Sequence, residues 1–98
     1  MPKKLRINMN RPEISQEKIN EALSQVIEII KTQLALKGPH SFASKHEILG
    51  VLTEEYNEVI EAIHTNCELI DFQAELRDVA AAAVFGLACT LQEGALDW

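Results

Sequence analysis

The sequence contains few aromatic residues, cysteines, glycines and prolines, and each shortage narrows the range of possible folds and functions. Aromatic residues make up 5% of the 98 residues, whereas hydrophobic residues make up 47%. This balance is typical of helices that pack through aliphatic side chains. The four glycines form no glycine-rich phosphate loop, and the sequence has no internal repeat or low-complexity segment. The length suits one small domain, so we expect a single all-α domain over residues 1–98.

The two cysteines are too far apart to act together. Cys67 and Cys89 do not form a CxxC motif, and no histidine near them has the spacing of a zinc site. We therefore predict two reduced thiols, with Cys89 packed as a small hydrophobic residue. The N-terminus lacks the apolar core of a signal peptide, which predicts a cytoplasmic protein. The uncharged segment Val79 to Leu91 has 13 residues, fewer than the roughly 20 that span a bilayer.

Basic residues are outnumbered by acidic ones, and the two kinds are unevenly distributed. Nine lysines and arginines against 15 aspartates and glutamates give a net charge of −6, which argues against nucleic acid as a partner and leaves a membrane partner unexpected. Residues 1–46 carry eight basic and four acidic residues, net +4, and residues 47–98 carry one basic and eleven acidic residues, net −10. We expect the second half to attract cations and the first half to face phosphates.

Hydrophobic spacing and helix-end signals predict three helices. Residues 1–12 have no sustained apolar period and are expected to form an extended arm. A long amphipathic helix, mostly core on its apolar side, is predicted from about residue 13 to 36. Its apolar positions are Ile19, Leu23, Val26, Ile27, Ile30 and Leu34. Gly38 and Pro39 then end this helix, because glycine adopts the left-handed cap and proline cannot continue the helix.

The second and third predicted helices flank a turn around Thr65, Asn66 and Cys67. Ser44 and Glu47 have the spacing of a capping box, which starts the second helix near residue 45, and this helix is predicted to end near residue 64. The third helix is predicted from about residue 68 to 92, followed by a loose tail at residues 94–98. The segment after Asp78 is apolar nearly all round, so three helices of one chain cannot bury it. We therefore predict a homo-oligomer, dimer or tetramer, that completes a four-helix-bundle core.

Two pairs of carboxylates occupy the helices on either side of that turn. Glu55 and Glu58 are three residues apart, as are Glu75 and Asp78, so each pair lies on one helical face. Each pair is also about ten residues from the turn, which places the two pairs at similar height in a helical hairpin.

Glu55 has an unusual position for an acidic residue, because helical numbering places it within the apolar stripe of its helix. That stripe comprises Ile48, Val51, Leu52, Val59 and Ala62. A buried carboxylate without a partner is costly, so a bound cation is the simplest explanation. All-oxygen ligation favours Mg²⁺ or Mn²⁺ over Zn²⁺. For any single acid the alternative is a solvated helix face, which we expect for Glu54, Glu61 and Glu68.

The pattern EExxE followed by ExxD, formed by Glu54, Glu55, Glu58, Glu75 and Asp78, resembles the signature of the all-alpha nucleoside triphosphate pyrophosphatases, the MazG-like superfamily. The resemblance covers roughly residues 45–91. It implies that Glu55, Glu58, Glu75 and Asp78 bind Mg²⁺ and that Glu54 is a supporting acid. It also implies hydrolysis of a nucleoside triphosphate between the α and β phosphates, which gives a nucleoside monophosphate and pyrophosphate.

The resemblance leaves the substrate open. A phosphoribosyl-ATP pyrophosphohydrolase would use the same site, and a non-catalytic helical interaction module would keep the bundle without the chemistry. The candidate substrate-binding residues are Lys31, Lys37, Lys45 and Trp98, the last as a stacking partner for a base. His40 and His46 flank the loop before the second helix. Either could contact a phosphate, but a lone surface histidine more often has no functional role.

Overall fold

The described part of the chain is all-α, as predicted. The computed structural model describes residues 10–92 and 94, which contain no strand and form helices α1 (Gln16–Lys37), α2 (Lys45–His64) and α3 (Leu69–Leu91). Residues 10–15 precede α1 without helical structure, and most of the predicted arm and tail lies outside the described residues. Within the described residues, no helix has the length and apolar character needed to cross a membrane.

Serine side chains fix where the first two helices begin. Ser15 Oγ accepts a hydrogen bond from the Lys18 amide at 3.1 Å, and Ser44 Oγ accepts one from the Glu47 amide at 3.2 Å. The Glu47 carboxylate reaches back and accepts from the Ala43 amide at 2.6 Å. The predicted capping box is therefore present, although its carboxylate binds the amide before Ser44 instead of that of Ser44 itself.

Backbone conformation ends α1 and shapes the connection between α2 and α3. Gly38 has a φ of 95°, and its amide donates to the Leu34 carbonyl at 2.9 Å. A side chain there would be strained, which explains why α1 ends at a glycine. Asn66 adopts a φ of 54°, a left-handed conformation that asparagine tolerates better than most residues. This turn directs α3 back along α2.

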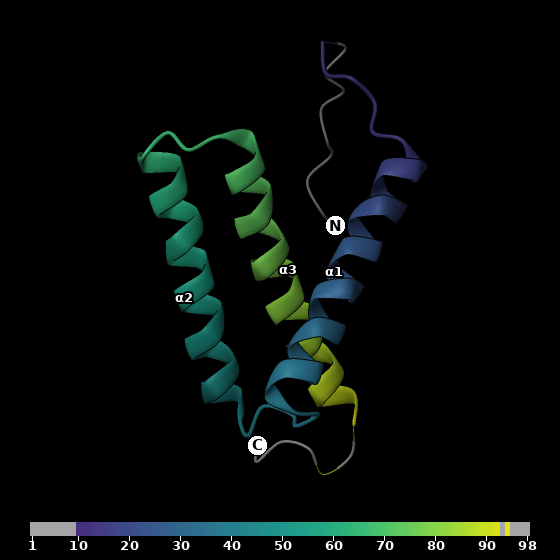
Figure 1. Cartoon of the computed structure of the whole chain (residues 1–98), viewed down its shortest axis with the longest axis vertical. Helices are drawn as coiled ribbons and strands as arrows, with labels where there is room; N and C mark the ends of the chain where they lie inside the picture. Colours follow the sequence, from purple (N-terminus) through teal and green to yellow (C-terminus); the bar gives the residue numbers. More distant parts are fainter. Residues whose placement is uncertain (1–9, 93, 95–98) are drawn as a thin grey trace, which may run out of the picture.

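α3 is the central helix, because it packs against both of the others. α2 and α3 form an antiparallel hairpin, and α1 crosses α3, whereas α1 and α2 do not pack on each other in the described part of the chain (Figure 1). Gly86 is buried where α3 meets α2, and a Cβ atom built on it would lie 3.2 Å from Ile48 Cγ2. The absence of a side chain at Gly86 therefore allows this close approach.

The core of the single chain is thin, and α1 contributes less to it than predicted. The buried hydrophobic residues are Val26, Ala62, Ala81 and Cys89. In the first half of α1, Ile19 is 40% exposed and Leu23 is 54% exposed. The prediction that this stripe is mostly core is wrong at Ile19, at Leu23 and at Ile27, which is 50% exposed, because α1 diverges from α3 toward its N-terminus (Figure 1). Cys89, only 4% exposed, packs as predicted.

We predict that Gly86→Val destabilises the fold by about 1–3 kcal/mol, because the added methyl groups collide with Ile48. Gly50→Val is the matched control in α2, since a Cβ at Gly50 meets nothing within 4 Å, and it should change stability by less than about 0.5 kcal/mol. Urea unfolding followed by circular dichroism measures both changes. Equal effects of the two substitutions would contradict the close approach at Gly86.

Candidate functional site

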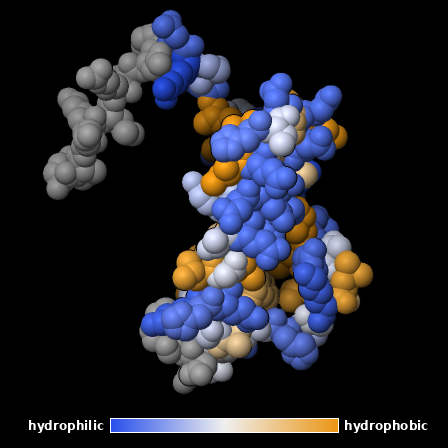
Figure 2. Space-filling model, turned by 90° about the vertical axis from the view of Figure 1, so that its left-hand side faces the viewer, coloured by the Kyte–Doolittle hydropathy of each residue, from blue (hydrophilic) through white to orange (hydrophobic). Residues whose placement is uncertain are grey.

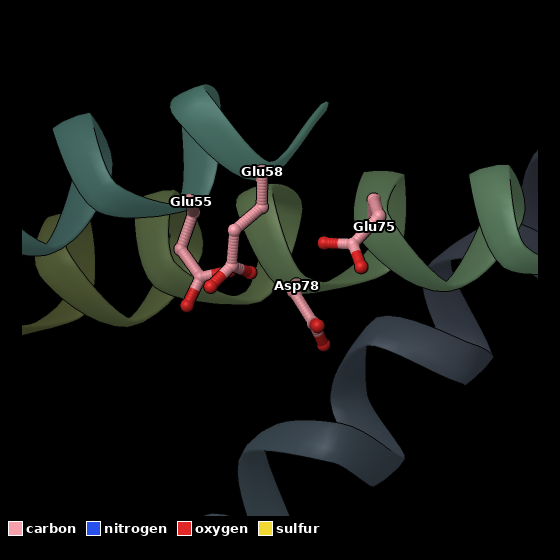
Figure 3. A group of neighbouring side chains, drawn as sticks. All are labelled: Glu55, Glu58, Glu75 and Asp78. Carbon is pink, nitrogen blue, oxygen red and sulfur yellow. The ribbon is translucent and has the colours of Figure 1, made fainter. Parts of the chain in front are cut away.

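The four carboxylates of the two predicted pairs meet between α2 and α3. Glu55 and Glu58 extend from α2, and Glu75 and Asp78 extend from α3, toward the same space (Figure 3). One oxygen atom from each residue can be chosen so that all four lie within 4.8 Å of one another. The structure therefore brings together the four residues that the sequence pattern singled out, which we call the acidic cluster.

Local structure around the hairpin turn produces this convergence. α2 ends at His64 and α3 begins at Leu69, and the Thr65 hydroxyl donates to the Glu61 carbonyl at 2.9 Å. This bond satisfies a backbone carbonyl that the end of the helix leaves open. Because the connection is short, positions at equal distances from it lie opposite each other on the two antiparallel helices. Glu58 and Glu75 are such positions, with Glu55 and Asp78 one turn further along.

Two oxygen atoms of the acidic cluster are shielded from water without a compensating contact. Glu55 and Glu75 are half-buried, yet Oε2 of each is fully buried and has no hydrogen-bond partner. A buried carboxylate oxygen without a donor costs free energy. The nearby cation, Arg77, does not meet this need, because its guanidinium donates to Gln25 Oε1 on α1 at 3.0 Å. The two oxygen atoms therefore lack the donor or cation that would compensate their burial.

The electrostatics of the acidic cluster reflect burial and crowding of like charges. Burial, followed by the charges of Glu58 and Asp78, raises the pKa of Glu55 from 4.5 to about 7. Burial and the charge of Glu58 also raise the pKa of Glu75. The pKa of Asp78 is raised by burial and by Glu58, with Arg77 acting in the opposite direction. These raised pKa values indicate that the carboxylates do not readily ionise together unless positive charge is added.

The donor set fits a hard divalent cation. Four carboxylates offer only oxygen atoms, which Mg²⁺ and Mn²⁺ prefer, and no thiol or imidazole lies among them. The unpartnered Oε2 atoms of Glu55 and Glu75 are the positions that a cation would satisfy. The residues that could hold such an ion are thus the four members of the acidic cluster.

A cavity of about 400 Å³ opens beside the acidic cluster. Glu55 and Asp78 line it, as do Lys37 at the end of α1 and His40 in the following loop. Its apolar wall includes Phe42 and Phe85, whose rings meet edge to face with centroids 5.1 Å apart and planes at 76°. A pocket with a mostly apolar wall and a few polar groups is a typical site for a small molecule.

The structure separates the lysines that the sequence offered for substrate binding. Lys37 lines the cavity, whereas Lys31 lies outside the lining and its Nζ is 3.7 Å from Glu28. Lys45 opens α2, also outside the lining. Trp98 lies outside the described residues. Glu54 is exposed on α2 and is not among the four converging acids.

Sequence reasoning missed the aromatic part of the cavity. Phe42 lies in a loop, where no hydrophobic period identifies a buried side, and His40 was expected to be idle. Phe85 looked like one of several apolar residues on all sides of its helix. The one available signal was the scarcity of aromatic residues, since Phe42 and Phe85 are two of only five aromatic residues.

The comparisons with known proteins add no family assignment: no family model matches the chain, and neither a curated protein nor a solved structure is significantly similar to it. Inferences about function therefore depend on the residues and geometry of the site.

We predict that the metal-free protein becomes less stable as the pH rises from about 5.5 to 8. The folded state binds protons at Glu55 more tightly than the unfolded chain does, with pKa values of about 7 and 4.5. The resulting stabilisation is complete below the unfolded value and disappears as the pH rises through the folded value. Thermal unfolding in the presence of a chelator measures this dependence.

Glu55→Gln should weaken that pH dependence, because the side chain of glutamine does not ionise in this pH range. Glu61→Gln, at an exposed acid of α2 outside the cluster, is the matched control and should retain the dependence of the wild type. The same slope in the wild type and in Glu55→Gln would contradict the crowding of charge at Glu55.

Proposed function

We propose that this chain is a Mg²⁺-dependent nucleoside triphosphate pyrophosphohydrolase of the MazG-like type, which cleaves between the α and β phosphates. The observation that carries the proposal is the acidic cluster, whose four oxygen atoms lie within 4.8 Å of one another beside a cavity of about 400 Å³. This combination supports a cation site next to a space for an organic molecule. A nucleotide fits both features, because its phosphates bind hard cations and its nucleoside can fill a pocket.

The polarity of the cavity supports a phosphate substrate. Its acidic end, at Glu55 and Asp78, repels phosphate unless a cation is bound. Lys37 supplies an ammonium group in the lining, and His40 supplies an imidazole. We therefore place the metal-binding phosphates at the acidic cluster and the distal phosphates toward Lys37. The edge-to-face pair of Phe42 and Phe85 provides an apolar wall for the base or sugar.

A Mg²⁺ ion held by Glu55, Glu58, Glu75 and Asp78 would neutralise the phosphates, orient the triphosphate and lower the pKa of an attacking water. The residues of the chain have separate tasks. The carboxylates of the acidic cluster fix the position of positive charge, and Lys37 compensates charge on the departing pyrophosphate. The partial burial of Glu55 and Glu75 keeps bulk water from screening these interactions.

We also propose that the chain acts as a homo-oligomer that completes a four-helix-bundle core. The single chain leaves large apolar side chains uncovered on every helix, among them Leu23 at 54%, Leu49 at 62% and Leu87 at 59% exposure. Monomeric soluble proteins seldom leave large apolar patches in water. Association would remove part of this surface from solvent and thicken the core.

We predict that Mg²⁺ or Mn²⁺ binds to the acidic cluster and that Glu55→Gln combined with Asp78→Asn reduces its affinity at least about 100-fold, because two of four charged ligands are lost. Isothermal titration calorimetry at pH 8 measures the affinity. Glu61→Gln is the control and should bind as the wild type does. Unchanged affinity in the double variant would show that the cation site lies elsewhere.

We predict that the protein releases pyrophosphate from a nucleoside triphosphate only when Mg²⁺ or Mn²⁺ is present. Glu58→Gln should reduce kcat/KM at least about 100-fold, because a misplaced cation loses both positioning and charge stabilisation. The assay screens ordinary and modified nucleoside triphosphates, and phosphoribosyl-ATP, with pyrophosphate and orthophosphate measured separately.

The products of this screen discriminate between the alternatives. Pyrophosphate from phosphoribosyl-ATP alone would identify the second candidate substrate. Orthophosphate as the first product would indicate hydrolysis at the γ phosphate and contradict the proposed binding register. Cation binding without turnover on any substrate would favour a non-catalytic helical module.

A further inference from the structure

One side of α3 carries no charged residue along its whole length. The charged residues of α3 are Asp71, Glu75, Arg77 and Asp78. At 100° per residue, all four point within about 100° of the direction of Asp78, toward the acidic cluster, α1 or α2. Leu69, Leu76 and Leu87 point about 160–180° away from Asp78 and are 70%, 47% and 59% exposed. We call this outward side of α3 the back face.

The back face has the spacing of a helix-packing seam. Its residues alternate at intervals of four and three positions: Leu69, Gln73, Leu76, Ala80, Ala83, Leu87 and Thr90. This is the repeat by which two helices interlock side chains along a shared line. Small residues occupy the centre and leucines lie on either side. Such a pattern is typical of a helix that packs against another helix.

α2 carries a matching seam on the same side of the hairpin. Its positions alternate at intervals of three and four residues: Leu49, Leu52, Tyr56, Val59 and Ile63. Leu52 and Val59 are half-buried, whereas Leu49, Tyr56 and Ile63 are 62%, 60% and 58% exposed. By helical numbering this seam points away from Glu47 and Val51, which line the cavity. The view onto the α2 side shows a hydrophilic band with hydrophobic side chains on both flanks (Figure 2).

We propose that the back face of α3 and the adjacent seam of α2 together bind the same surface of a second copy of the chain. The two α3 helices are antiparallel in this dimer. The repeat on α3 is self-complementary in this orientation. When the two-fold axis passes between Ala80 and Ala83, Ala80 of each copy meets Ala83 of the other. Leu76 of each copy then meets Leu87 of the other, and Gln73 meets Thr90 at the polar margins. One register thus pairs small with small, large with large and polar with polar.

The size of the face also fits a second copy. A 20-residue helix such as α2 is about 30 Å long, and two adjacent helices present a strip about 20 Å wide. Two copies therefore bury about 1,200 Å² in total, the lower end of the range for stable protein interfaces. The absence of charge from the back face of α3 favours an apolar, identical partner over a charged ligand. Because the acidic cluster and the cavity lie on the other side, the association leaves them accessible.

The register can be tested by charge complementation. Leu76→Glu and Leu87→Lys should each raise the dimer dissociation constant at least about 100-fold, because each places charge in an apolar layer. In the double variant, the carboxylate at position 76 faces the ammonium at position 87 of the other copy. We expect the double variant to recover affinity to within about tenfold of the wild type. Sedimentation equilibrium and light scattering measure the association, and circular dichroism measures helicity.

Leu36→Glu is the matched control, because Leu36 is 76% exposed on α1 and belongs to neither seam. It should leave the association unchanged. A monomeric wild type, single variants that associate as the wild type does, or loss of association in Leu36→Glu would overturn the proposed interface. Single variants that dissociate with no recovery in the double variant would overturn the register. None of these outcomes depends on the proposed reaction, because association is measured without substrate or metal.

Discussion

The crowding of four carboxylates between α2 and α3 is the constraint on which the rest of the structure depends. One oxygen atom from each lies within 4.8 Å of those chosen from the others, a separation at which like charges repel strongly in a partly buried site. The hairpin must be held together against that repulsion. The short turn at Asn66 and the close contact between Gly86 and Ile48 supply the geometry. A divalent cation would supply the missing charge, and protonation of Glu55 relieves part of the repulsion in its absence.

α3 combines three roles because its sides differ in chemistry. One side carries Glu75 and Asp78 to the acidic cluster, a second meets α1 through Arg77 and Gln25, and the third is the charge-free back face. A single chain can satisfy only the first two, since α1 and α2 already occupy the neighbouring sides. The thin core of the isolated chain follows from this arrangement. The association proposed above would add the burial that the single chain lacks.

The basic and acidic halves of the sequence both contribute side chains to the lining of the cavity. The basic first half of the chain contributes Lys37 and His40, and the acidic second half contributes Glu55 and Asp78. A triphosphate with a bound cation carries both charges that such a lining can compensate. For the proposed function, the same polarity would let an acidic protein bind an acidic substrate. The local field at the site, and not the net charge, decides the attraction.

The sequence alone determined the features that depend on neighbours in the chain. The cap at Ser44, the stop at Gly38 and the two carboxylate pairs follow from local hydrogen bonding and helical periodicity, so they could be predicted. Only the tertiary structure decided how α1 crosses α3. That crossing exposes Ile19 and Leu23, places Lys37 but not Lys31 in the cavity, and brings Phe42 onto Phe85. No local period encodes it, because it depends on the fit of side chains from segments far apart in the sequence.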